Sequence, residues 1–418
     1  MGKKVLVVTY YFPPSGGAGV QRWLKMLRHF PENGWDPIVL TPDPRQASYP
    51  QRDDTLVREI PKGLRVETTP TREVLSLLKR ASGERSLPHS GFSDTERPTL
   101  WQRMMRFVRG NFFLPDARRG WNRYAFRRAV ELLEGDPDIK AVVTTSPPHS
   151  SQLVGLRLKR LFPQIAWVAD LRDPWTDIYY MHRLYPTRLA RWWNLRLEAS
   201  VVCGADAVWT TCASTCRTLS ARYPQAAGRI SVLSNGYDEG DFAEQAPGIQ
   251  PYVTYIGTLT DPHDLEGFWP AFRSCPYRLR FVGEAALEHH IPHDLRERVE
   301  LLPRVPHREA VRLMRQSTVL LLVTPQVEEA SAVVPGKLFE YLAAGRPILA
   351  LTRTDSDAAR ILEQQRAGWV AGYNDTDRMA RFLQAPEADF APADPGGYSR
   401  GALATEAVRR INDCISLT

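Results

Sequence analysis

Three charged side chains lie at the end of an apolar segment, namely Asp170, Arg172 and Asp173. Their types and spacing suit contact with a polar or charged ligand. Residues Ile165 to Asp170 read as a buried strand, so these side chains should emerge at the carboxyl edge of a parallel sheet, where open α/β folds bind ligands. Arg172 could stabilise a developing negative charge, and Asp170 or Asp173 could orient a hydroxyl nucleophile. The alternative is a structural network of these three charges.

Two further segments suit proton transfer or contact with anions. His149 lies in Ser-Pro-Pro-His-Ser at the end of another predicted strand and is a second candidate for acid–base chemistry. The Pro/Gly-rich loop from Tyr10 to Gly19 connects a strand to a helix. Its Gly16 and Gly17 would let the backbone approach a diphosphate, to which the following helix offers free N–H groups. A tight turn with no ligand is the alternative for this loop.

The segment from Val334 to Gly345 carries the strongest signal for an anion site. Its Pro-Gly pair predicts a turn, after which a helix begins near Lys337. A cation in the first helical turn is opposed by the helix dipole by ~0.3–1 kcal/mol, so Lys337 indicates that an anion binds there. The alternative is a solvated Lys337 beside Glu340, three residues later.

Alternating strands and helices are predicted to position these segments. Strands are predicted at Lys3–Thr9, Pro37–Thr41, Ala141–Thr145, Ile165–Asp170, Ala207–Thr211, Tyr252–Ile256, Leu279–Val282, Val319–Val323 and Ile348–Leu351. Helices are predicted at Val20–Phe30, Leu153–Leu161, His307–Gln316 and Lys337–Ala344. This alternation predicts parallel sheets, and 418 residues exceed what one core usually organises. We therefore predict two doubly wound α/β domains, at residues 1–228 and 229–400, followed by an amphipathic helix at residues 401–418.

Composition and charge exclude several classes of protein. No stretch approaches the ~18 apolar residues of a membrane span, and a cytoplasmic location is expected. Residues 1–230 carry 35 Lys and Arg against 21 Asp and Glu, or +14, whereas the remaining residues carry −7. This asymmetry favours one basic domain that faces an anionic lipid surface. No zinc-finger, RNA-binding or basic-zipper pattern indicates a nucleic-acid partner.

A basic amphipathic segment extends from Trp101 to Arg128, with eight Arg and one acid. One face of its helix is predicted to contain Trp101, Met104, Met105 and Val108. Arg103 and Arg106 lie opposite, and each Arg near anionic lipid contributes about 1 kcal/mol. The predicted membrane patch consists of Trp101, Arg103, Met104, Arg106 and Arg109. A lid helix and a basic groove for an anionic glycan are the alternatives, and the similar Trp192 and Trp193 are predicted to be core.

Four motifs give the chain a family resemblance. They are K-V-L-V-V-T-Y-Y-F-P-P-S-G-G-A-G-V-Q-R at the start, T-S-P-P-H-S followed by D-L-R-D-P-W, S-N-G-Y-D, and P-G-K-L-F-E-Y-L-A-A-G-R-P-I-L-A. In this order and at these intervals they resemble family 4 glycosyltransferases, in particular those that act on bacterial surface polysaccharides. The resemblance covers nearly the whole chain. It implies a retaining GT-B enzyme, with two Rossmann-like domains facing a cleft and a final helix that crosses back onto the first domain.

The resemblance assigns roles at a nucleotide-sugar site. Glu340 would accept hydrogen bonds from the ribose hydroxyls of the donor, and the start of its helix would face the diphosphate. The residues implied in donor binding are Gly16, Gly17, Gly257, Thr258, Gly283, Val305, Pro306, Gly336, Lys337, Leu338 and Glu340. Related enzymes neutralise the diphosphate with protein groups, so neither a metal nor a cofactor is expected.

The sequence departs from the family pattern at three positions. Ala332 stands where relatives have the first of two glutamates, so the role of that carboxylate is either dispensable or supplied by a neighbour such as Glu328 or Glu329. Thr258 and Asp264 stand where relatives often carry Arg and Lys. Hydroxyl or backbone donors and the lysine at the helix start would then hold the diphosphate.

The predicted function is therefore transfer of a sugar from a nucleotide donor to a lipid-linked saccharide or glycan, at the inner face of the cell membrane. An epimerase of the same fold and a catalytically inactive binding protein are the alternatives. The epimerase would convert a nucleotide sugar without an acceptor. The binding protein would bind the donor without turnover.

Overall fold

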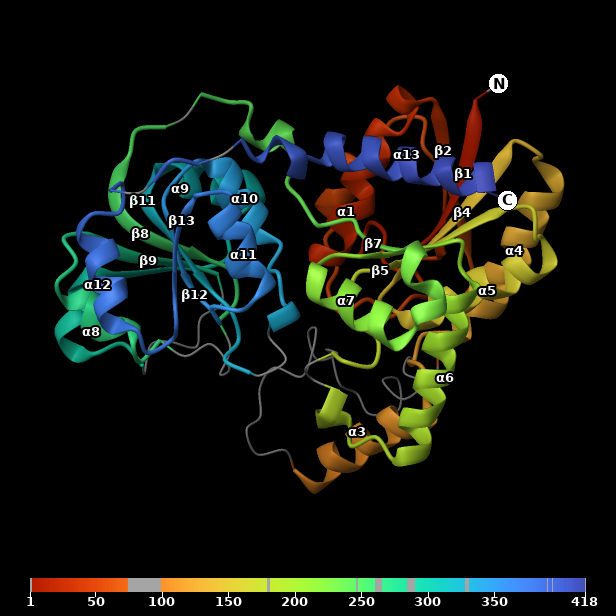
Figure 1. Cartoon of the computed structure of the whole chain (residues 1–418), viewed down its shortest axis with the longest axis horizontal. Helices are drawn as coiled ribbons and strands as arrows, with labels where there is room; N and C mark the ends of the chain where they lie inside the picture. Colours follow the sequence, from red (N-terminus) through yellow and green to blue (C-terminus); the bar gives the residue numbers. More distant parts are fainter. Residues whose placement is uncertain are drawn as a thin grey trace. The chain divides into compact units, whose positions relative to one another are not determined.

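Two parallel sheets organise the chain in a computed structural model, which describes residues 2–73, 99–178, 181–245, 247–259, 265–283, 290–327, 331–388, 390–392 and 394–417 (Figure 1). Residues 1–234 and 400–418 form one compact unit, called unit 1, and residues 235–399 form unit 2. Helices cover both faces of each sheet. The predicted class of two Rossmann-like α/β domains is confirmed.

The sheet of unit 1 has seven parallel strands in the order β3-β2-β1-β4-β5-β6-β7. Its strands are β1 (Lys3–Val8), β2 (Trp35–Pro42), β3 (Arg65–Thr69), β4 (Ile139–Ser146), β5 (Ala166–Leu171), β6 (Ala207–Thr210) and β7 (Ile230–Val232). The strand order reverses between β1 and β4, which is the point where open α/β sheets bind ligands. Because β7 pairs with β6, unit 1 continues past residue 228 to Ser234.

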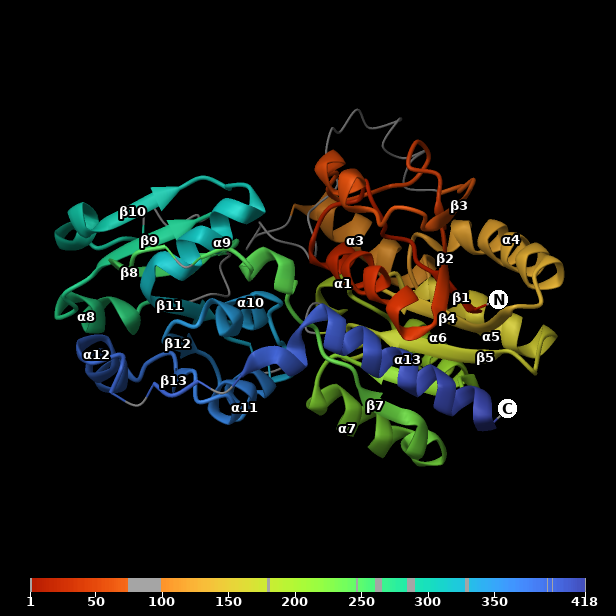
Figure 2. The same ribbon diagram turned by 90° about the horizontal axis from the view of Figure 1, so that it is seen from above.

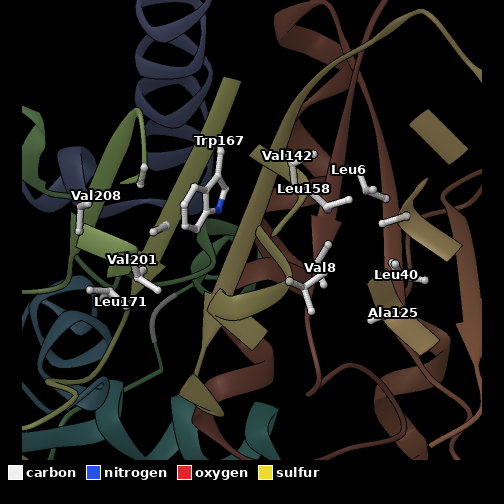
Figure 3. Close-up of a cluster of buried hydrophobic side chains, with 14 of the residues drawn as sticks. Leu6, Val8, Leu40, Ala125, Val142, Leu158, Trp167, Leu171, Val201 and Val208 are labelled. Carbon is white, nitrogen blue, oxygen red and sulfur yellow. The ribbon is translucent and has the colours of Figure 1, made fainter. Parts of the chain in front are cut away.

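The core of unit 1 lies on both faces of its sheet. In β1, Leu6 and Val8 pack on one face and Val5 and Val7 on the other, as expected for a parallel sheet buried on both sides. The helices are α1 (Ala18–Met26), α3 (Leu100–Phe112), α4 (Asn122–Gly135), α5 (Gln152–Leu161), α6 (Arg188–Gly204), α7 (Ala213–Arg222) and α13 (Arg400–Leu417). Figure 3 shows the α4–α7 face, where Trp167 lies among aliphatic side chains.

Helix α13 belongs to unit 1 although it ends the chain. It lies beside α1, and its Leu403, Ala407 and Ile411 are buried in the same core cluster as residues of α1 (Figure 2). The predicted return of the final helix to the first domain is therefore confirmed.

Unit 2 repeats the same strand order with six parallel strands, β10-β9-β8-β11-β12-β13. They are β8 (Gln250–Ile256), β9 (Arg278–Val282), β10 (Val299–Leu302), β11 (Ser317–Val323), β12 (Ile348–Leu351) and β13 (Gly368–Ala371). The helices are α8 (Phe268–Arg273), α9 (His307–Gln316), α10 (Lys337–Ala344), α11 (Asp357–Gln364) and α12 (Thr376–Gln384). Here the strand order reverses between β8 and β11, and α10 follows β11.

Candidate functional site

The Arg172 side chain connects two loops at the carboxyl edge of the unit 1 sheet. Its Nε donates to the Ser146 carbonyl at 2.9 Å and its Nη2 to the Pro147 carbonyl at 3.1 Å, while Nη1 donates to the Gly19 carbonyl. The side chain is 7% exposed, and burial lowers the pKa of the guanidinium. A guanidinium has five N–H donors, so these three bonds leave two for an anionic ligand.

The glycine loop lies against Arg172. A Cβ at Gly19 would be 2.8 Å from Nη1 of Arg172, so the close approach requires glycine. Gly17 has φ 93°, a left-handed conformation that also favours glycine. The amide of Gly16 donates to the Gln51 carbonyl at 3.0 Å and is therefore used by the fold. Of the two glycines assigned to a diphosphate, the exposed Gly17 is better placed, and the assignment stays a prediction.

His149 lies in the loop after β4, and its ring stacks on Trp175 with centroids 4.9 Å apart and planes 13° apart. Nδ1 of His149 is buried without a hydrogen-bond partner among the described residues. Burial, with the nearby charge of Arg172, lowers the pKa of His149 to about 3. The imidazole is therefore neutral at physiological pH, and its buried Nδ1 is costly unless a ligand completes its hydrogen bonding.

Asp170 occupies a different place from the one predicted. Its carboxylate is fully buried and accepts hydrogen bonds from Arg22 at 3.1 and 3.2 Å, Trp23 at 2.8 Å and Thr145 at 2.9 Å. This geometry does not fit contact with an acceptor, and it makes Asp170 a positioning residue that fixes α1 to the sheet. The half-buried Asp173 stays a candidate, and burial raises the pKa of its carboxyl group.

Lys337 is the first residue of α10 in unit 2. Its Nζ donates to the Ile256 carbonyl at 3.2 Å and lies 3.7 Å from the centroid of the Tyr255 ring. Burial lowers the pKa of Lys337 to about 7, although Glu340 opposes this shift. Ammonium and amine forms are thus nearly balanced at neutral pH, and an anion at the helix start would favour the ammonium.

Two glycines end neighbouring strands next to Lys337. Gly257 and Gly283 have φ of 134° and 127°, and a Cβ at Gly283 would be 2.4 Å from the Gly257 carbonyl oxygen. A Cβ at Gly257 would be 3.1 Å from Nζ of Lys337. Thr258 is exposed and its carbonyl accepts a hydrogen bond from Tyr255. The backbones at Gly257 and Gly283 therefore lie close together beside Lys337, at a place where larger side chains would obstruct a ligand.

Three acids that the sequence analysis named lie outside the described residues. They are Asp264, Glu328 and Glu329. In the described parts of the chain, no group of three His, Cys, Asp or Glu side chains lies close enough to hold a metal ion.

The Glu340 carboxylate lies beside His307, in the strand-end segment whose Val305 and Pro306 were assigned to donor binding. Nε2 of His307 is 3.9 Å from Oε1 of Glu340 and 2.9 Å from Oδ2 of Asp241. His307 begins α9 directly after Val305 and Pro306, and this position at a strand-end loop was the available signal. The carboxylates can accept hydrogen bonds from hydroxyl groups, and the imidazole can donate or accept a hydrogen bond.

Of the residues assigned to donor binding, one instead serves packing and another is partly covered by the core. Leu338 is fully buried, and its amide donates to the Pro335 carbonyl at 3.0 Å. Val305 is half-buried against the core cluster of α9 and α10. Pro306 is exposed before α9, and Gly336 precedes α10 with open space around its Cα. Backbone at Pro306 and Gly336 therefore remains accessible, whereas the Leu338 side chain does not.

The predicted membrane patch is only partly exposed. Trp101, Arg103 and Met104 are exposed, but Arg106 and Arg109 are half-buried. Met105 and Val108, predicted on the apolar face, are also half-buried. The reason is packing: Gly110 of α3 lies so close to Leu184 that a Cβ would be 2.4 Å from the Leu184 carbonyl oxygen.

Trp192 and Trp193 are 46% and 47% exposed, so their predicted core position is wrong. With α3 they belong to a surface of exposed apolar side chains that we call the α3–α6 surface. It comprises Leu100, Trp101, Met104, Phe107, Phe112, Tyr185, Leu189, Trp192, Trp193 and Leu195. These are ten of the fourteen large apolar side chains that are exposed in the described residues. Such concentration marks an interaction surface.

Comparison with known proteins supports a glycosyltransferase. Residues 250–385 match the family model described as glycosyl transferases group 1, so the match covers most of unit 2, including Lys337 and Glu340. A search of the curated proteins finds no match.

Solved structures share the fold at low sequence identity. Sucrose-phosphate synthase from Thermosynechococcus elongatus is 14% identical, with a TM-score of 0.57 over 99% of this chain and 96% of that chain. HepE of Anabaena, in complex with UDP, is 12% identical, with a TM-score of 0.58 over 99% and 98%. A UDP-GlcNAc 2-epimerase from Methanocaldococcus jannaschii is 10% identical, with a TM-score of 0.51 over 98% and 99%. The fold is thus shared by transferases and epimerases.

Proposed function

We propose that this protein is a retaining, family 4 glycosyltransferase that moves a sugar from a nucleotide donor to a lipid-linked saccharide or glycan in surface-polysaccharide synthesis. Unit 2 binds the donor. The observation that carries this proposal is the pairing, on α10, of a half-buried lysine with a carboxylate three residues later, within the matched region. Lys337 neutralises the diphosphate, and Glu340 accepts hydrogen bonds from the ribose hydroxyls.

Unit 1 binds the acceptor in this proposal. Arg172 offers two N–H groups to anionic charge, while neutral His149 and Asp173 offer hydrogen-bonding atoms to a hydroxyl. The epimerase alternative rests on the fold shared with the M. jannaschii enzyme. An epimerase would turn over a nucleotide sugar with no acceptor present, and this difference separates the two functions.

Nucleotide sugars should stabilise the protein, and Glu340→Gln should weaken that effect. In a panel of nucleotide sugars that begins with UDP-glucose, we expect at least one to raise the Tm of the wild type, because binding to the native state adds RT ln(1 + [L]/Kd). Losing a charge-assisted hydrogen bond costs about 1.5–3 kcal/mol, so Glu340→Gln should raise the Kd roughly tenfold or more in calorimetry.

The matched control is Glu363→Gln, which removes an exposed carboxylate at the end of α11 in the same unit. This variant should bind the donor as the wild type does. An unchanged Kd for Glu340→Gln would remove Glu340 from the donor site. A panel without a single stabilising nucleotide sugar would contradict the donor-binding proposal itself.

The α3–α6 surface is proposed to bind the anionic inner leaflet of the cell membrane. Residues 99–115 and 178–197 contain no Asp or Glu, whereas Arg103, Arg188, Arg191 and Arg196 are exposed among the apolar side chains. Exposed tryptophans with surrounding Arg suit the boundary between headgroups and acyl chains. None of the helices in the described part of the chain combines the length and the apolar character that a membrane span requires. The proposed association is therefore peripheral.

Removing one tryptophan and one charge from this surface should release the protein from membranes. Arg103→Glu combined with Trp192→Asp should lower binding to phosphatidylglycerol vesicles at least tenfold, since each Arg near anionic lipid contributes about 1 kcal/mol and its reversal costs more. Vesicle flotation measures the bound fraction. The control, Arg160→Glu with Leu161→Asp, changes exposed residues at the end of α5 and should float as the wild type does. Equal flotation of both double variants would refute the membrane role.

A further inference from the structure

An apolar pocket of about 610 Å³ lies in unit 1 where α3, α4, α5 and α6 meet. Five of its lining residues are large and apolar, namely Phe112, Leu114, Leu153, Trp193 and Leu197. The volume falls within the range of about 300–1,000 Å³ typical of small-molecule sites. A pocket with this lining favours a hydrocarbon ligand, because it gains free energy from each apolar group removed from water.

The pocket is continuous with the α3–α6 surface. Phe112 and Trp193 line it and are also 65% and 47% exposed. The two sides of the surface are joined where Asn111 donates to the Tyr185 carbonyl at 3.1 Å and accepts from the Thr187 amide at 2.8 Å. Two of the side chains that line the pocket therefore also belong to the surface proposed to face lipid. Arg119 is the single charged residue in the lining, and it suits an anionic headgroup.

Two hydrogen bonds connect the pocket walls to residues that adjoin His149. Asn122, a lining residue, donates Nδ2 to the carbonyl of Ser150, the neighbour of His149, at 2.7 Å. Asn194, adjacent to Trp193, accepts a hydrogen bond at 3.1 Å from Trp175, whose ring stacks on His149. The pocket walls are thus bonded to the loop that carries His149 and to the tryptophan on which its ring stacks.

We propose that this pocket holds the hydrocarbon chain of the acceptor, a single-chain lipid phosphate that carries the saccharide. The inference rests on the proposed transferase function, because it identifies the acceptor class for the same enzyme. The acceptor is favoured over a bilayer phospholipid because the pocket walls are hydrogen-bonded to the residues around His149. The charge of Arg119 and the acid-free α3–α6 surface match the phosphate.

The test uses dodecyl phosphate, below its critical micelle concentration and without vesicles, titrated into the whole protein by calorimetry. We expect saturable binding at one site, and a Kd at least tenfold higher for Leu153→Asn, since a polar group in an apolar pocket lowers the free energy gained from the chain. Phe112→Asp serves as a second variant, because Phe112 is exposed and lies outside the core. This substitution should weaken binding in the same way. Trp101→Ser, on the surface but outside the pocket lining, should leave the Kd within about twofold, as expected for a site it does not touch.

Three results would overturn the proposal. They are binding that does not saturate, a Kd unchanged in both Leu153→Asn and Phe112→Asp, and inorganic phosphate that binds as tightly as dodecyl phosphate. Short-chain phosphatidylglycerol that competes equally well would identify a bilayer lipid as the occupant and would also overturn it. Stabilisation by nucleotide sugars, measured on the same samples, should persist in every variant. If nucleotide sugars did not stabilise the wild type, that result would count against the transferase function and not against the lipid site.

Discussion

Arg172→Ala should lower kcat at least 100-fold while the Kd for the nucleotide sugar stays unchanged. The guanidinium holds the glycine loop and the loop after β4 through three carbonyls, which leaves two N–H groups for an anionic ligand. Removing one preorganised donor to a developing negative charge typically costs about 10²–10³ in kcat. Steady-state kinetics with the stabilising nucleotide sugar, together with calorimetry of donor binding, separates turnover from binding.

Arg172→Lys should fail nearly as completely, because an ammonium cannot reproduce a planar fork that spans three carbonyls. The control is Arg217→Ala, which removes an exposed arginine on α7 of the same unit and should retain full activity. If Arg172→Ala lowered the Tm but retained the wild-type kcat, Arg172 would be a structural residue. The search for the acceptor-side group would then move to His149 and Asp173.

Lys337→Met should weaken binding of a nucleoside diphosphate much more than binding of the bare nucleoside. The half-buried ammonium at the start of α10 is expected to recognise the phosphates, and a charge-assisted contact of this kind is worth about 1.5–3 kcal/mol, or roughly 10- to 100-fold in Kd. The control is Arg346→Met, which removes a cation just beyond the opposite end of α10. Equal losses for nucleoside and nucleoside diphosphate would make Lys337 structural.

The pH dependence gives a second signature of Lys337. Its pKa is about 7 without ligand, and a bound diphosphate raises that pKa by stabilising the ammonium. Below pH 7 the charge is already present, whereas above pH 7 binding must take up a proton. The affinity of the wild type should therefore fall as pH rises from 7 to 9, by up to about tenfold per pH unit. Lys337→Met should remove this part of the dependence.

Local sequence signals were sufficient to predict where the strands end and where α10 begins. Apolar runs that end in glycine or charged residues predicted the strands, and Pro335-Gly336 predicted where α10 begins. Parallel strands place their carboxyl ends at one edge, and His149 and Arg172, each predicted to follow a strand, lie near one another. These inferences needed only nearby residues and the geometry of a parallel sheet.

Other features of the site depend on contacts between residues that are far apart in the sequence, and these contacts could not be predicted from local patterns. The sequence suggested that Asp170 contacts a ligand. Its carboxylate instead accepts a hydrogen bond from Arg22, on a helix 148 residues earlier. His307 reaches Glu340 only because α9 and α10 lie side by side. The exposed face of α3 depends on the contact of Gly110 with Leu184, which no helical periodicity encodes.

The central claim is sugar transfer, and the direct measurement follows a labelled sugar. The protein is incubated with the nucleotide sugar that stabilises it most, labelled in the sugar, and with lipid extracted from bacterial membranes. We expect that label moves into the lipid fraction, that one nucleoside diphosphate is released per sugar transferred, and that both processes require the lipid. Conversion of the nucleotide sugar to an epimer without lipid, or stable binding without either product, would contradict it.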